Sequence, residues 1–204
     1  MAAGLGRERL NGSDLQRPFH GVRSSGLELD SISDLCLAYA ARMLESHAFS
    51  HSTAAALHGF PLPWVVRQAR ELHVAAPPRQ AVPRLRGVLG HSADTSGAVS
   101  LHGLRVLPAL TVWCQLAAQL QHNQLVAAGD YLLGGRRPFA TPAQLYAAVE
   151  EWSPRRGAAA LRRALRDVRV GVDSPKETEL RLLLLSWGLP EPLVNQRYYD
   201  AHGR

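Results

Sequence analysis

The 204-residue chain contains one lysine, two cysteines and no long apolar run. Cys36 and Cys114 lack the close spacing of a metal-binding motif, and two thiols do not make a disulfide framework, so we expect both to be buried. No run of about 18 apolar residues is present, and residues 1–10 carry charges without a long apolar stretch. These absences argue against a transmembrane helix and a signal peptide. The sequence therefore predicts a cytoplasmic protein without a membrane partner.

Lysine is so scarce that arginine supplies almost all of the positive charge. Lys176 is the single lysine, yet the chain has a net charge of +6 and a pI of about 10.0. Arginine forms bidentate contacts with phosphate groups and with guanine, so an anionic partner is one explanation. A GC-rich genome is the other, and composition alone leaves both open.

Hydrophobic spacing predicts many helices and a smaller strand region. The predicted helices cover residues 31–46, 50–58, 108–120, 123–133, 142–152, 157–169 and 174–187. The predicted strands cover residues 18–22, 72–75, 86–90, 104–106 and 193–199, with a hairpin turn at 200–204. This order predicts an α+β protein that is mainly helical, with a small three- or four-stranded sheet. We place the domain boundary at residues 170–173, between a domain at 1–170 and a segment at 174–204.

A cluster of arginines lies between residues 155 and 169. Its members are Arg155, Arg156, Arg162, Arg163, Arg166 and Arg169. At 100° per residue they fall on one arc of a helix, while Leu161, Ala164 and Leu165 fall on the opposite arc. Such a helix presents a guanidinium face suited to DNA phosphates. The alternative is a solvated helix surface in an arginine-rich proteome.

Glu177 is the candidate catalytic residue, near the start of the helix predicted at 174–187. It projects on the same side as Leu180 and Leu184, which we expect to pack inward. A carboxylate near a core-facing stripe suits a divalent metal ion or its bound water. The alternative is structural, because Ser174 and Glu177 fit a capping box in which the carboxylate accepts the Ser174 backbone N–H.

A short alanine-rich helix, predicted between Ser50 and Gly59, is typical of helix-turn-helix units. The segment that follows, residues 60–64, has the composition of a loop, so no recognition helix is predicted. His51 and His58 lie roughly on one face of this helix. No third metal ligand is near in the sequence, so we interpret both as structural or surface histidines and predict no metal site.

Asp130 lies within an apolar helical pattern. A buried carboxylate needs hydrogen-bonding or ionic partners. We expect a structural ion pair with Arg136 or Arg137, the nearest cations that follow it in the sequence.

Several segments together resemble an actinobacterial family that joins a region similar to the AbiEi antitoxins to an endonuclease domain similar to very-short-patch-repair nucleases. The segments that carry the resemblance are Arg17–Arg23, Phe49–Gly59, Pro61–Pro63, Leu72–Val74, Gly129–Asp130 and Ser174–Pro190. Their order and spacing are more specific than any one of them. Antitoxins of this kind usually begin with a winged helix-turn-helix, for which the residues before Ile32 are too few.

The resemblance implies that residues 174–204 are the first helix and strand of a restriction-endonuclease-like, PD-(D/E)XK fold. Glu177 is then at the position of the helical glutamate that supports the metal site. The metal-binding Asp and the (D/E)-x-K motif of such domains have no counterpart in this sequence. The complete family domain is expected to use Mg²⁺, whereas we expect no cofactor in this chain.

The sequence therefore predicts a DNA-associated protein of a toxin–antitoxin or phage-defence family that does not itself cleave DNA. The alternative is a non-enzymatic, antitoxin-like regulator that binds DNA or a toxin protein. A third alternative is a truncated gene product with an unpaired edge strand at 193–199. The sequence makes no prediction of the oligomeric state.

Overall fold

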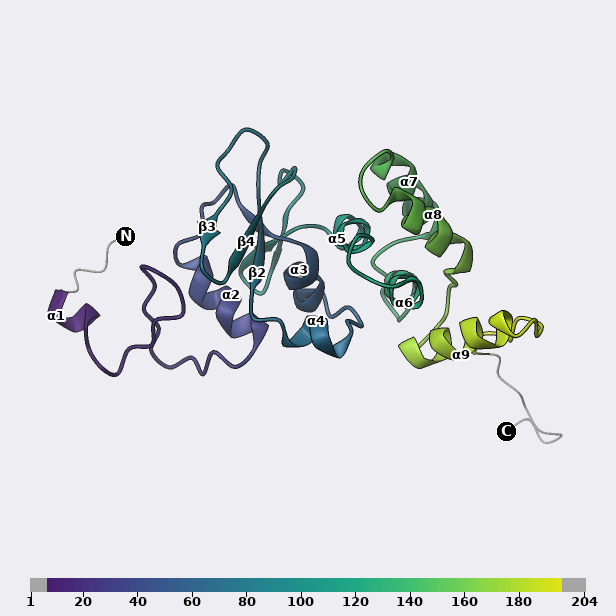
Figure 1. The fold of residues 1–204 in the computed structure, drawn as a ribbon, viewed down its shortest axis with the longest axis horizontal. Helices are drawn as coiled ribbons and strands as arrows, with labels where there is room; N and C mark the ends of the chain where they lie inside the picture. Colours follow the sequence, from purple (N-terminus) through teal and green to yellow (C-terminus); the bar gives the residue numbers. More distant parts are fainter. Residues whose placement is uncertain (1–6, 196–204) are drawn as a thin grey trace. The chain divides into compact units, whose positions relative to one another are not determined.

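The computed structural model describes residues 7–195, which form two compact units. Within this range, unit 1 comprises residues 7–58 and 64–108, and unit 2 comprises residues 59–63 and 109–195. Unit 1 contains a sheet with helices beside it, and unit 2 is helical (Figure 1). The predicted α+β class is therefore confirmed.

The strands of unit 1 form a six-stranded mixed sheet among the described residues, in the order β3-β4-β2-β1-β6-β5. Their bounds are β1 Ala48–Phe49, β2 Leu72–Ala76, β3 Arg84–Leu85, β4 Val88–Ser92, β5 Val99–Leu101 and β6 Leu104–Val106. β2 pairs with β4 in parallel and β1 pairs with β6 in parallel, while the other pairs are antiparallel. The register places His73 opposite Leu89 and Ala75 opposite His91.

The core of unit 1 lies between this sheet and two helices, α2 (Ile32–Ala40) and α3 (His51–Leu57), which both contact β2 (Figure 1). β2 is almost continuously buried, as expected for a central strand with a parallel neighbour. Ser31 begins α2 with a capping box that Asp34 completes. The smaller helices are α1 (Arg7–Leu10) and α4 (Trp64–Gln68).

Unit 2 is built around α6, which contacts three other helices of the unit, α5, α8 and α9. The helices span α5 Ala109–Leu116, α6 His122–Leu133, α7 Pro142–Trp152, α8 Ala158–Asp167 and α9 Pro175–Ser186. The fully buried Trp113 indole donates from Nε1 to the carbonyl of Leu125 at 2.9 Å, so its polar atom is satisfied inside the core.

Gly129 on α6 allows a close approach inside unit 2. A Cβ atom at this position would lie 2.5 Å from Cγ2 of Val168 and 3.3 Å from Cζ2 of Trp113. Any larger residue would push the chain after α8 away from α6. The close approach at Gly129 also brings the backbone N–H of Arg169, the residue after Val168, to within 2.7 Å of Oδ1 of Asp130.

The helix predictions in unit 2 are confirmed within a few residues at the helix ends, and the strands at 72–75 and 104–106 are found as β2 and β6. The prediction of a small strand at 18–22 is wrong, because these residues form bends and turns and the region contributes only an isolated bridge between Gln16 and Ser24. The sheet has more strands than predicted, because it includes β1 and β3, which have two residues each and were not predicted. Both cysteines are buried, and burial raises the pKa of Cys114 to about 12.

The described part of the chain ends in a turn at residues 194–195. Residues 193–195 form no strand, and the rest of the strand predicted at 193–199, with the turn at 200–204, lies outside the described residues. The two compact units also differ from the predicted domains 1–170 and 174–204. The division between the two units falls near residue 108. α9 packs on α6 and belongs to the same helical unit.

In the described part of the chain, each helix is too short or too polar to cross a bilayer.

Candidate functional site

The arginine cluster forms an exposed surface centred on α8. Five of its six members are exposed: Arg155, Arg156, Arg162, Arg163 and Arg166. The opposite side of the helix is buried in unit 2 through Leu161 and Ala164. For Arg162, Arg163 and Arg166 this is the amphipathic arrangement that the 3.6-residue period predicts, whereas Arg155 and Arg156 lie in the turn before the helix.

The cations on this surface have few acidic neighbours. Within residues 7–195, no ion pair joins any of the five exposed arginines to a carboxylate. Arg162 donates to the hydroxyl of Ser153 at 3.2 Å, and Arg155 lies 4.8 Å from the ring centroid of Trp152. Asp167 instead contacts His122, with 2.8 Å between Oδ2 and Nε2. We call the five arginines the α8 arginine face.

Arg169, the sixth candidate, is engaged inside unit 2. Its Nε lies 2.8 Å from Oε1 of Glu191, and its Nη1 donates to the carbonyl of Arg166 at 2.7 Å. The guanidinium of Arg169 lowers the pKa of Glu191, and burial acts in the opposite direction. Arg169 is thus held by tertiary contacts that a helical projection does not show.

Glu177 lies in the first turn of α9 and is held by the start of that helix. Its carboxylate accepts the Ser174 hydroxyl at 2.9 Å and the Asp173 backbone N–H at 3.3 Å. The Glu177 N–H in turn donates to Oγ of Ser174 at 3.3 Å. These contacts resemble the capping alternative, with Asp173 rather than Ser174 supplying the backbone donor.

The inward face of α9 differs from the prediction. Leu180 is 55% exposed, so the expectation that Glu177, Leu180 and Leu184 share an inward side is wrong. The buried residues of α9 are Thr178 and Arg181. The face is polar because it meets a buried carboxylate on α6 rather than an apolar surface.

That carboxylate belongs to Asp130, which is 1% exposed. Its Oδ2 accepts Thr178 Oγ1 at 2.7 Å and Nη2 of Arg181 at 3.1 Å, and its Oδ1 accepts the backbone N–H of Arg169 at 2.7 Å. Burial raises the pKa of Asp130, and these three donors oppose the rise. The predicted structural ion pair exists, but its partner is Arg181 on α9.

Arg136 and Arg137, the partners predicted for Asp130, are both exposed in the loop after α6. They follow the helix in sequence, but the buried side of Asp130 faces α9. The prediction chose the nearest cations in the sequence, whereas the fold supplies a cation 51 residues away.

Three histidines of unit 1 come together at one point: His51 at the start of α3, His73 on β2 and His91 on β4. One ring nitrogen from each lies within 4.8 Å of the others. Nδ1 of His73 is 2.9 Å from Nε2 of His91, and the His51 ring stacks on the His91 ring with centroids 3.9 Å apart. We call these residues the histidine cluster.

Burial keeps the histidine cluster neutral near pH 7. Burial first, and the neighbouring imidazoles second, lower the pKa of His51 to about 3 and the pKa of His73 to about 4. Burial also lowers the pKa of His91. A neutral imidazole has one nitrogen lone pair available to accept a hydrogen bond or to bind a metal ion.

The sequence interpretation missed this cluster. It treated His51 as a structural or surface residue and predicted no metal site, because no third ligand was near in the sequence. Among the residues described, the histidine cluster is the group of three or more His, Cys, Asp or Glu side chains whose ligand atoms converge. The parallel register of β2 and β4, which the sequence pattern does not specify, brings His73 and His91 to one face of the sheet.

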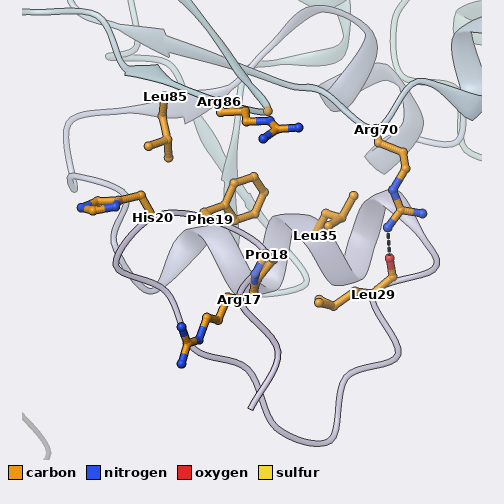
Figure 2. Close-up of a pocket in the computed structure, with 10 residues that line it drawn as sticks. Arg17, Pro18, Phe19, His20, Leu29, Leu35, Arg70, Leu85 and Arg86 are labelled. Atoms are coloured by element: carbon orange, nitrogen blue, oxygen red, sulfur yellow. Dashed lines mark hydrogen bonds between the residues drawn. The ribbon is translucent and has the colours of Figure 1, made fainter. Parts of the chain in front are cut away.

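Unit 1 also contains a cavity of about 610 Å³ between its N-terminal segment and the β3–β4 turn. Figure 2 shows Phe19 and Leu35 among the apolar residues that line it, with Arg86 on the sheet side. Arg70, also in the lining, donates to the carbonyl of Leu29, whose φ is 57°. The lining of this cavity combines apolar side chains with arginines, which suits a small molecule that carries both an apolar surface and negative charge.

Comparison of the chain with known protein families, with curated proteins and with solved structures finds no match.

Proposed function

We propose that this chain is a DNA-associated, non-enzymatic protein that contacts the phosphate backbone through the α8 arginine face. The observation that carries the proposal is the exposure of five arginines in α8 and the turn before it, none of them paired with an acidic side chain among the described residues. Phosphate contacts by arginine release condensed counterions and supply most of the affinity of sequence-independent DNA binding.

The arrangement of these arginines favours backbone contact over base reading. Arg162, Arg163 and Arg166 lie within about 6 Å along the axis of α8, at a rise of about 1.5 Å per residue. The apolar side of the helix holds it against unit 2, so the guanidinium groups project from a fixed element. A fixed row of cations positions a protein on the duplex but carries no sequence information by itself.

Cleavage is not part of the proposal. Phosphodiester hydrolysis by Mg²⁺ needs carboxylates that hold the ion and a means of activating water. Glu177 already accepts two donors at the start of α9, and within the described chain it belongs to no group of three or more converging metal-ligand side chains. One occupied glutamate does not supply both requirements.

The proposal keeps the relation to antitoxin–endonuclease proteins that the sequence resemblance implies. In that relation, the region before α9 is antitoxin-like and α9 is the first helix of a restriction-endonuclease-like fold. Support comes from the apolar side chains that α9 and the residues after it expose. These are Leu180, Leu183, Trp187, Leu189 and Leu193, each at least 45% exposed.

The same apolar residues favour a second candidate function, an antitoxin-like regulator that binds a toxin protein. Exposed apolar side chains that cluster on one element often mark a protein-binding surface. The two candidates differ in the force that drives binding, because phosphate contact weakens steeply with salt and apolar contact does not.

The test is DNA binding by the full chain and by a triple variant, Arg162→Gln, Arg163→Gln and Arg166→Gln. We expect the wild type to bind a labelled duplex at low salt with a dissociation constant on the order of 1–100 μM. The triple variant should bind about 10-fold more weakly or worse, because three phosphate contacts are lost. Fluorescence anisotropy measures both affinities.

The matched control removes the same charge from unit 1, through Arg67→Gln, Arg79→Gln and Arg84→Gln. These three arginines are exposed, and the control should stay within a few-fold of the wild type. Equal losses in both triple variants would show that net charge, rather than the α8 arginine face, drives binding. Undetectable binding by the wild type at low salt would reject DNA and favour the protein partner.

A further inference from the structure

We propose that His51, His73 and His91 form a binding site for a divalent transition-metal ion, Zn²⁺ above others. The site lies in unit 1 and is separate from the α8 arginine face, which belongs to unit 2. It therefore stands independently of the proposed DNA binding.

The first argument is convergence from separate elements. Imidazoles from α3, β2 and β4 place their ligand nitrogens within 4.8 Å of one another. The parallel register of β2 and β4 puts His73 and His91 on the same face of the sheet, two residues apart in register. Zinc sites with one open position commonly use three protein ligands, and three histidines are one such set.

The second argument is the distance between the nitrogens. Zn–N bonds of about 2.0–2.1 Å at a tetrahedral angle place two nitrogens about 3.3 Å apart. Nδ1 of His73 and Nε2 of His91 are 2.9 Å apart in the structure, joined by a hydrogen bond. The separation that a shared metal ion requires is therefore about half an ångström larger than the one observed, with the two rings rotated so that both lone pairs point at the ion.

The third argument is the support around the ligands. The Ser50 hydroxyl lies 3.1 Å from Nδ1 of His51 and helps to fix the orientation of that ring. The backbone N–H of His73 donates to Thr53 Oγ1 at 2.8 Å, and the carbonyl of His73 accepts Ser50 N at 2.9 Å. The two backbone bonds fix the His73 backbone against α3, and the Ser50 hydroxyl is a contact to a ring nitrogen of the kind that orients histidine ligands.

The fourth argument is the backbone of His51. Its φ is 48°, in the left-handed region that non-glycine residues seldom adopt. A strained residue persists where the surroundings require its position, and such residues concentrate at binding and catalytic sites. Here the strained backbone aims the ring of His51 at the other two imidazoles.

The composition of the cluster selects the metal. No thiolate or carboxylate belongs to it, so it disfavours Mg²⁺ and Ca²⁺, which prefer oxygen ligands. Imidazole suits Zn²⁺, Cu²⁺ and Ni²⁺, and three imidazoles leave a coordination position for water. The competing explanation is a purely structural trio of neutral, hydrogen-bonded histidines.

The experiment is calorimetric titration of Zn²⁺ into the metal-free full chain near neutral pH, with Co²⁺ absorption as a second readout. We expect one strong site per chain and a visible Co²⁺ band from nitrogen ligands. His73→Gln and His91→Gln, each shown to be folded by circular dichroism, should weaken binding by about 10–100-fold or more.

The matched control is His102→Asn, which removes an exposed histidine of the same unit and keeps a side chain that tolerates its φ of 51°. The control should bind Zn²⁺ like the wild type. If the wild type binds no Zn²⁺ and shows no Co²⁺ band, the cluster is a structural trio and the proposal is wrong. Equal weakening by His102→Asn would also overturn it, because binding would then be adventitious.

Discussion

Replacement of Arg181 with methionine is expected to lower the free energy of unfolding of unit 2 by about 3–5 kcal/mol. Arg181 and Asp130 are each 2% exposed at the side chain, and 3.1 Å separates Nη2 from Oδ2. Methionine fills similar space but leaves the Asp130 carboxylate buried without its cation. The loss then reflects an uncompensated charge rather than a cavity. Chemical denaturation followed by circular dichroism measures it.

Two further variants separate this explanation from a general effect of mutation. Asp130→Asn combined with Arg181→Met should be less destabilised than Arg181→Met alone, because no charge is left unpaired while the Arg169 N–H keeps an acceptor. Lys176→Met on the same helix removes half of an exposed pair with Glu179 and should change stability by less than about 1 kcal/mol. An Arg181→Met variant as stable as Lys176→Met would contradict the buried-pair account.

Acidification is expected to destabilise unit 1 through the histidine cluster. In the unfolded chain these histidines titrate near their ordinary pKa of 6.5, whereas in the folded chain the pKa values of His51 and His73 are about 3 and about 4. Between these limits the unfolded state binds more protons than the folded state, so stability falls as pH falls. The expected loss between pH 7 and pH 5 is about 2 kcal/mol for each of these two histidines.

Urea denaturation at pH 7 and pH 5, in the presence of a chelator, measures this loss. A double variant, His73→Gln and His91→Gln, should show a shallower pH dependence, while His102→Asn should follow the wild type. His47 adds a contribution of the same sign, because burial also lowers its pKa, so the variant should not become pH-independent. A wild type at least as stable at pH 5 as at pH 7 would contradict the expectation.

Local signals in the sequence predicted the helices of unit 2 well. Thr141 and Ser174 each precede a proline, and the structure begins α7 at Pro142 and α9 at Pro175. A capping side chain followed by proline specifies a helix start within a few residues, without help from the rest of the fold. Boundaries of this kind are therefore accessible from one sequence.

Tertiary contacts explain the predictions that were wrong or incomplete. β1 and β3 have two residues each, too few to show an alternating pattern, and they exist because neighbouring strands pair with them. Asp130 pairs with Arg181 rather than with the nearby Arg136 or Arg137, and Leu180 is exposed because the polar residues of α9 face that carboxylate.

The candidate sites also differ in whether local sequence or tertiary contacts determine them. Helical periodicity predicts the exposed positions of Arg162, Arg163 and Arg166 in the α8 arginine face, while Arg155 and Arg156 lie in the turn before α8. Arg169, which the same projection included, is engaged by a distant glutamate. The histidine cluster has no sequence motif, since 18 residues separate His73 from His91 and strand register brings them together. The periodicity of hydrophobic and charged residues therefore predicts a site on one helix, and it does not predict a site that strand pairing assembles.

The central claim is that the chain binds DNA without cutting it, and one assay tests both parts. Supercoiled plasmid is incubated at low salt with the purified chain and Mg²⁺ or Mn²⁺, then run on an agarose gel before and after the protein is removed. We predict slower migration of the protein-bound plasmid and no nicked product after removal. Nicking that disappears in a Glu177→Ala variant would contradict the account and make Glu177 a catalytic residue.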